Sequence, residues 1–122
     1  MINILVVDDD KNIRRLMKAV LEREGYTVVL AENGEEAMKQ MESEHIDLCV
    51  LDVMMPKMNG YEATKAIRSM ENLRKAKIPI IAMTANAFDE DRRKALEAGM
   101  NDHVTKPISI ADLSKAIYKV LR

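Results

Sequence analysis

The sequence predicts an α/β fold with a doubly wound, five-stranded parallel sheet and five helices. Two observations lead to this prediction. Several short segments are apolar without interruption, which is typical of strands buried on both faces of a parallel sheet. Segments with helical periodicity alternate with these strands along the chain. Because crossovers between parallel strands are right-handed, the helices should cover both faces. We expect the strand order 2-1-3-4-5, with a ligand site beyond the carboxyl ends of the strands.

Apolar runs give the positions of the strands, and capping residues give the boundaries of the helices. Asp10 and Asn33 stand where helix N-caps are expected, and Gly25 and Gly99 stand where helices should end. The strands are expected at residues 2–7, 26–31, 47–51, 80–83 and 103–105. The helices are expected near residues 13–24, 34–43, 60–70, 89–98 and 110–121.

The composition is that of one folded domain and argues against several classes of protein. With 122 residues, 48% of them hydrophobic, and a net charge of −1, the chain can form one core, and we expect residues 1–122 to be a single domain. The near-neutral charge argues against direct nucleic-acid binding, and no apolar segment is long enough to insert into a membrane. The single Cys49 lies within an apolar segment, which fits a core residue of a cytoplasmic protein.

Three aspartates stand at the ends of expected strands. Asp8 and Asp9 follow the first strand and Asp52 ends the third, and these two strands are neighbours in the expected order. Clustered carboxylates repel one another. Mg²⁺ relieves this repulsion, because it binds one or two carboxylates and accepts phosphate oxygens in its remaining positions. The next residue, Asp10, is interpreted as a helix cap.

Two further strands end in residues that complement a phosphoryl group. Lys106 can neutralise a phosphoryl oxygen as a point charge, and the Thr84 hydroxyl can turn toward such an oxygen. Pro107 leaves open whether the peptide bond after Lys106 is cis. Together, the strand ends predict a site for a divalent cation and a phosphoryl group.

Four motifs occur in order along the chain. They are Val6-Val7-Asp8-Asp9, the segment from Leu51 to Gly60, Met83-Thr84-Ala85 and Lys106-Pro107. In type and spacing they resemble the receiver domain of two-component response regulators, a flavodoxin-like fold, and the similarity covers nearly the whole chain. Residues 82–87 are most similar to receivers attached to hybrid sensor histidine kinases.

The resemblance implies a Mg²⁺-dependent transfer of phosphate from a histidine kinase, or a histidine phosphotransfer protein, to an aspartate. Such a domain promotes its own phosphorylation and dephosphorylation and is not an enzyme with an external substrate. The implied phosphoacceptor is Asp52. The implied metal ligands are Asp9, Asp52 and the main-chain carbonyl of Met54, with Asp8 helping directly or through water. Thr84 and Lys106 are implied to contact the phosphoryl group.

The resemblance further implies a switch between two conformations. Phosphorylation would draw Thr84 and Lys106 toward the phosphoryl group, and in the family an aromatic residue at the place of His103 then moves inward. A histidine there departs from the usual Tyr or Phe, and its charge can change near neutrality, so we expect weaker or pH-sensitive coupling. The output surface is expected within residues 89–122, in a monomer or a phosphorylation-dependent dimer.

The resemblance also identifies the two positions at which the family tunes hydrolysis of the phosphoryl group, here Met54 and Asn86. An apolar Met54 cannot orient attacking water by hydrogen bonding. We therefore expect a long-lived phosphorylated form.

Three other interpretations compete with this one. A haloacid-dehalogenase-like phosphatase also has a nucleophilic aspartate after its first strand, but its motif needs Thr or Val where this chain has Asn12. A flavodoxin-type binding module needs a Ser/Thr/Gly-rich phosphate loop, and this chain has an acidic segment there. A degenerate receiver that serves only as a scaffold is opposed by the complete set of Asp9, Asp52, Thr84 and Lys106.

Overall fold

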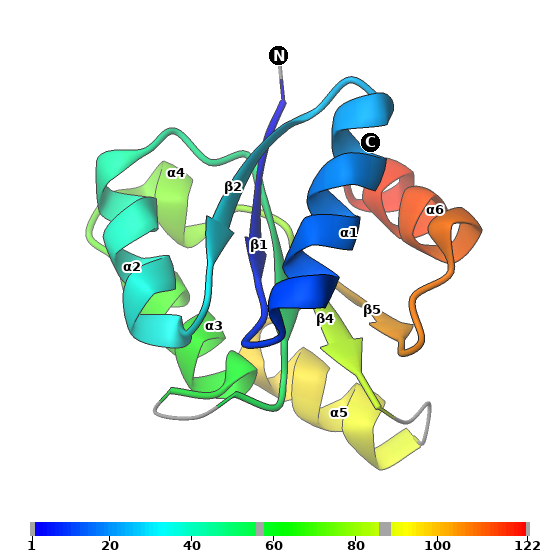
Figure 1. Cartoon of the computed structure of the whole chain (residues 1–122). Coiled ribbons are helices and arrows are strands. Elements are labelled where there is room, and N and C mark those ends of the chain that lie inside the picture. The colour runs from blue at the N-terminus through cyan, green and yellow to red at the C-terminus, as the bar shows by residue number, and fades with distance from the viewer. Residues whose placement is uncertain (1, 56–57, 86–88, 122) are drawn as a thin grey trace.

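The computed structural model describes residues 2–55, 58–85 and 89–121, which form a sheet with helices on both faces (Figure 1). All neighbouring strands are parallel and follow the order β2-β1-β3-β4-β5, which confirms the predicted topology. The strands are β1 Asn3–Val7, β2 Thr27–Ala31, β3 Leu48–Asp52, β4 Ile80–Thr84 and β5 Asp102–Thr105. The helices are α1 Lys11–Arg23, α2 Gly34–Ser43, α3 Gly60–Arg68, α4 Leu73–Ala76, α5 Asp89–Ala98 and α6 Ile110–Leu121. Among the described residues, no helix combines the length and apolar character needed to cross a membrane.

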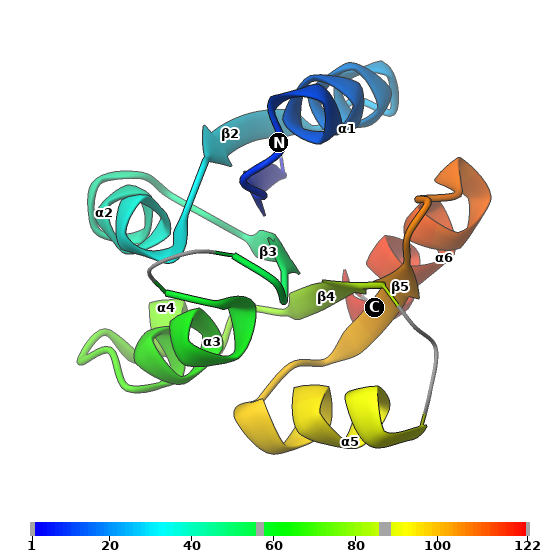
Figure 2. The same cartoon turned by 60° about the horizontal axis from the view of Figure 1, so that its bottom comes forward.

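The helices form two layers, one on each face of the sheet (Figure 2). Helices α1 and α6 pack on one face, and α2, α3 and α5 pack on the other. The alternation along β1 follows from this arrangement, since Ile4 and Val6 face the first layer while Leu5 and Val7 face the second. Every residue of β3 and β4 is buried, as their uninterrupted apolar runs predict.

Local sequence sets the helix boundaries as predicted. The Asp10 carboxylate accepts hydrogen bonds from two main-chain amides in the first turn of α1, and Asn33 caps α2 in the same way with one. Gly25 and Gly99 follow α1 and α5 with φ angles of 93° and 105°. Glycine is favoured at both positions, because a residue with a Cβ rarely adopts these angles.

One helix was not predicted, so the expected count of five was one short. Helix α4 is a single turn of four residues, capped by Asn72, and is too short to show apolar periodicity. Its Arg74 guanidinium donates hydrogen bonds to Asp47 Oδ1 at 2.6 Å and to the Ile46 carbonyl oxygen at 3.2 Å. These contacts join α4 to the segment just before β3.

Candidate functional site

The polar residues predicted at the strand ends lie at one edge of the sheet. Asp8 follows β1, Asp52 ends β3, and these two strands are neighbours. On the next strands, Thr84 pairs with Thr105 in the register of β4 and β5, and Lys106 follows Thr105 directly. The topology therefore brings together residues that are distant in the sequence.

Three carboxylates form the centre of this edge. Asp8, Asp9 and Asp52 each offer an oxygen, and these oxygens lie within 4.8 Å of one another. Asp8 and Asp52 are only 0% and 4% exposed, whereas Asp9 is exposed. The cluster thus has two buried carboxylates and one side open to solvent.

Lys106 supplies an ammonium group to both buried carboxylates. Its Nζ lies 3.0 Å from Asp8 Oδ2 and 3.1 Å from Asp52 Oδ2. Burial works against the charged lysine, but its close contacts with Asp8 and Asp52 and their negative charges outweigh burial and raise the pKa of Lys106. Lys106 is therefore charged at neutral pH.

Main-chain amides fix the orientation of both buried carboxylates. Asp52 Oδ1 accepts a hydrogen bond of 3.0 Å from the Met54 amide, and Asp8 Oδ1 accepts one of 2.9 Å from the Asp10 amide. Burial, reinforced by the charge of Asp52, raises the pKa of Asp8 although the Asp10 amide and Lys106 oppose the change. Ionisation of Asp8 is thus less favourable than that of an exposed aspartate.

The donor set fits a hard divalent cation. Three carboxylates and one ammonium leave an excess of two negative charges when all four groups are ionised. Among the described residues, Asp8 Oδ2 accepts no hydrogen bond of good geometry, despite its ion pair with Lys106. Carboxylate oxygens beside an open face are the kind of donors that Mg²⁺ binds.

Gly60 allows α3 to begin against the main chain of Asp52, a role that sequence reasoning missed. A Cβ at Gly60 would lie 2.5 Å from the Asp52 carbonyl oxygen and 2.8 Å from the Val53 Cα. The Gly60 amide also donates a hydrogen bond of 3.3 Å to the Val53 carbonyl. From the sequence alone, Gly60 was recognised only as part of a motif and as a helix start.

Thr84 and Lys106 are joined through the main chain. Thr84 is buried, with 2% exposure, and its carbonyl accepts a hydrogen bond of 2.7 Å from the Lys106 amide. The bond between Lys106 and Pro107, which the sequence left open, is cis.

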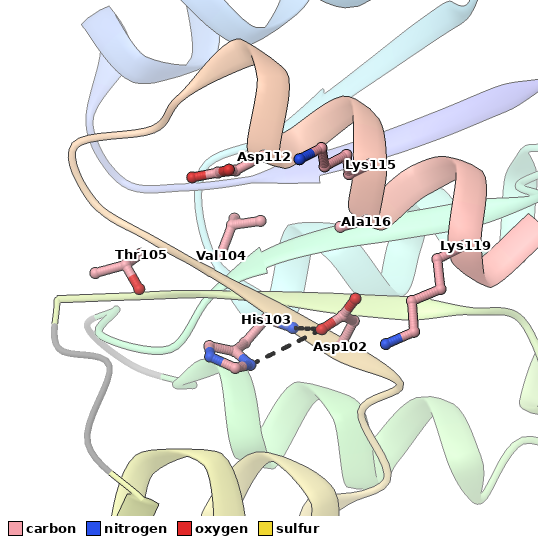
Figure 3. Close-up of a pocket in the computed structure, with 8 residues that line it drawn as sticks. All are labelled: Asp102, His103, Val104, Thr105, Asp112, Lys115, Ala116 and Lys119. Atoms are coloured by element: carbon pink, nitrogen blue, oxygen red, sulfur yellow. Dashed lines mark hydrogen bonds and ion pairs between the residues drawn. The ribbon is translucent and has the colours of Figure 1, made fainter.

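His103 lies on β5 at the edge of the sheet, beside a cavity of about 290 Å³ between β5 and α6 (Figure 3). Its main-chain amide donates a hydrogen bond of 2.8 Å to Asp102 Oδ1, and its ring Nδ1 lies 3.9 Å from the same oxygen. Asp112, Lys115 and Lys119 of α6 line the cavity with them. The part of His103 in a switch stays a prediction.

Of the two positions implied in hydrolysis of the phosphoryl group, the structure describes Met54 but not Asn86. The Met54 side chain is 72% exposed, and its main chain lies beside Asp52 through the amide hydrogen bond. Asn86 lies outside the described residues.

A comparison with family models agrees with these motifs. The model of the response regulator receiver domain matches residues 4–118. The chain belongs to this family. Receiver domains are phosphoacceptor signalling domains of two-component systems, and they act as switches rather than as conventional enzymes.

Curated relatives of this receiver domain include transcriptional regulators. Alkaline phosphatase synthesis transcriptional regulatory protein PhoP of Bacillus subtilis is 43% identical over 119 residues, covering 98% of this chain and 48% of PhoP. Transcriptional regulatory protein CpxR of Escherichia coli is 40% identical over 119 residues, covering 98% of this chain and 49% of CpxR. The chain thus spans about half the length of these relatives.

Solved structures of similar fold include a chemotaxis protein and the receiver domain of a sensor histidine kinase. Chemotaxis protein CheY4 of Vibrio cholerae aligns with a TM-score of 0.91 and 32% identity over 98% of both chains. The receiver domain of sensor histidine kinase PA1611 from Pseudomonas aeruginosa aligns with a TM-score of 0.87 and 37% identity, over 98% of this chain and 96% of its own. The PA1611 structure has a magnesium ion coordinated in its active site cleft.

Proposed function

We propose that residues 1–122 form one receiver domain in which Asp52 is phosphorylated in a Mg²⁺-dependent reaction. The donor would be a histidine kinase or a histidine phosphotransfer protein. The observation that carries this proposal is the environment of Asp52, which is a buried carboxylate 3.1 Å from the Lys106 ammonium, with Asp8 and Asp9 oxygens within 4.8 Å. Among the three carboxylates of the cluster, only Asp52 is buried and also accepts hydrogen bonds of good geometry from both a main-chain amide and the ammonium.

In the proposed transfer, an oxygen of Asp52 attacks the phosphorus of a phosphohistidine. A P–O bond forms, the P–N bond breaks, and the departing imidazole keeps the electron pair and takes up a proton. The Met54 amide on Oδ1 and the Lys106 ammonium beside Oδ2 orient the carboxylate before the reaction. This orientation lowers the barrier, because most catalysis of phosphoryl transfer comes from positioning and charge neutralisation.

The proposed metal ligands are Asp9, Asp52 and the main-chain carbonyl of Met54, with Asp8 acting directly or through water. The support is the oxygen-rich donor set and the negative charge that Lys106 leaves unbalanced. The magnesium ion in the related PA1611 receiver also supports it. Bound Mg²⁺ would supply positive charge next to the phosphoryl oxygens.

We further propose that Thr84 and Lys106 contact the phosphoryl group and that His103 takes part in the resulting switch. The output surface would comprise α5, β5 and α6; of these, β5 pairs with β4, whose last residue is Thr84. The domain would promote its own phosphorylation and dephosphorylation, in the cytoplasm, as a monomer or a phosphorylation-dependent dimer. Its downstream partner would bind this surface, without direct nucleic-acid contact by the domain or membrane insertion.

The test is incubation with Mg²⁺ and acetyl phosphate, followed by intact-mass measurement. Wild type should gain the mass of one phosphoryl group, Asp52→Asn should gain none, and omission of Mg²⁺ with chelator present should abolish the gain. As a control, Asp112→Asn removes an acidic group of α6 and should react like wild type. A gain in both wild type and Asp52→Asn, or in neither, would contradict the proposal.

A further inference from the structure

Arg14 of α1 reaches back to the turn that carries Asp8 and Asp9. Its Nη1 donates a hydrogen bond of 2.8 Å to the main-chain carbonyl oxygen of Asp8. Arg14 is partly buried, so water competes less for this bond than it would at an exposed site. The contact joins the first turn of the helix to the end of β1.

The bond to the Asp8 carbonyl affects the next residue, because the peptide unit is planar. The Asp8 carbonyl lies in one plane with the amide nitrogen and the Cα of Asp9. Holding its oxygen therefore fixes the plane from which the Asp9 side chain projects.

Asp9 depends on this plane more than Asp8 does. The Asp8 amide donates to the Ala31 carbonyl at 3.2 Å, and Asp8 Oδ1 accepts from the Asp10 amide at 2.9 Å. The Asp9 carboxylate, by contrast, has no hydrogen bond or ion pair with any described residue. Its position is thus set by the main chain, and the Asp8 carbonyl is the part of that main chain that Arg14 holds.

We propose that Arg14 is a positioning residue for Mg²⁺ binding, acting on Asp9 through the Asp8–Asp9 peptide. The inference rests on the proposed function, in which Asp9 is a metal ligand. Arg14 need not touch the ion. The charge of Arg14 acts in the opposite direction, because a cation near the site repels Mg²⁺. The sign of the change on removing Arg14 therefore separates positioning from simple electrostatics.

The experiment is a calorimetric titration of the purified, unphosphorylated protein with Mg²⁺. Arg14→Ala should raise the Kd by roughly tenfold, the lower range for loss of a group that orients a metal ligand. Arg15→Ala is the matched control, because it removes the same charge from the next residue of α1, which is exposed and makes no hydrogen bond or ion pair with the described residues of the turn. Its Kd should stay within about twofold of wild type, since an exposed charge is screened by solvent and salt.

A double-mutant cycle tests whether Asp9 carries the effect. In an Asp9→Asn background, Arg14→Ala should change the Kd by less than about twofold, because the coupled residue is already absent. An equal loss of Mg²⁺ affinity in both backgrounds, or an unchanged or lower Kd in Arg14→Ala alone, would overturn the inference.

Thermal unfolding without Mg²⁺ checks that each variant is folded. If Arg14→Ala is unfolded, the same criteria apply to Arg14→Gln. If wild type binds no Mg²⁺, the proposed function fails together with this inference. If wild type binds Mg²⁺ and Arg14→Ala binds it with the same Kd, only the inference is refuted.

Discussion

Replacing Gly60 with alanine adds one methyl group where α3 begins against the main chain of Asp52. The added Cβ would lie 2.5 Å from the Asp52 carbonyl oxygen and 2.8 Å from the Val53 Cα. Both neighbours are main-chain atoms, so no side-chain rotation can relieve the contact. Since Cβ atoms essentially never approach other heavy atoms within 3.0 Å, α3 or the end of β3 must move by at least about 0.5 Å.

Two opposing effects determine the size of the change in stability. Alanine in place of glycine favours a helix by up to about 1 kcal/mol. Overpacking against a fixed main chain costs about 1–3 kcal/mol. After the helical gain is subtracted, we expect Gly60→Ala to lower the free energy of unfolding by about 1 kcal/mol. The same movement displaces Asp52, the proposed phosphoacceptor, and a displacement of this order should slow phosphorylation by roughly tenfold.

Urea unfolding gives the stability of Gly60→Ala, and the rate of mass gain with Mg²⁺ and acetyl phosphate gives its reactivity. The control is Ile117→Val, which trims a fully buried residue of α6 and should cost about 1 kcal/mol. This control should be phosphorylated at the wild-type rate under conditions where both proteins are folded. If Gly60→Ala is as stable as wild type, or if the two variants are phosphorylated equally fast, the reasoning is refuted.

Three further predictions concern hydrolysis, pH and packing. Met54→Asn should shorten the lifetime of the phosphorylated protein, because an amide can orient attacking water and a thioether cannot; equal rates of phosphate loss by intact mass would refute this. Despite burial, a hydrogen bond from the Asn3 amide and nearby cationic groups lower the pKa of Asp47. The ionised carboxylate therefore stabilises the fold fully above the ordinary pKa of 3.8, and this contribution is lost as the pH falls through the lowered pKa. Asp47→Asn should therefore cost about 1 kcal/mol at neutral pH and almost nothing near pH 2, as measured by urea unfolding, and a constant difference would contradict this. Arg68 donates hydrogen bonds to three main-chain carbonyls and to Asn101. Lysine lacks the planar guanidinium that makes these bonds, so Arg68→Lys should lower the free energy of unfolding by about 2 kcal/mol. Unchanged urea unfolding would contradict this stabilising role of Arg68.

The sequence was enough to predict that the site residues lie together, because parallel strands in such a sheet all end at the same edge. Asp8, Asp52, Thr84 and Lys106 each stand at the end of an apolar run, and parallel strands end at one edge of the sheet. The rule needs no knowledge of loop conformation, which is why residues separated by nearly the whole chain could be assigned to one site. The individual roles proposed for them stay predictions.

The features that were missed depend on distances that exist only in the folded chain. Helix α4 has four residues and therefore no detectable period. The importance of Gly60 depends on how closely α3 approaches the Asp52 carbonyl oxygen. Arg14 has the sequence context of an ordinary helix residue, and only its side-chain conformation connects it to the turn after β1.

Lys106 connects the charge state of the carboxylate cluster to the edge strand β5. Its ammonium is shared between Asp8 and Asp52, at 3.0 and 3.1 Å, so a new anion at Asp52 would compete with Asp8 for it. A phosphoryl group brings a charge of about −1.5 to −2, more than the carboxylate charge that it replaces. The main-chain amide of Lys106 donates a hydrogen bond of 2.7 Å to the Thr84 carbonyl, so the residue that carries this ammonium is tied to the ends of both β4 and β5. Under the proposed function, this link offers a route by which the strand that carries His103 responds to phosphorylation of Asp52.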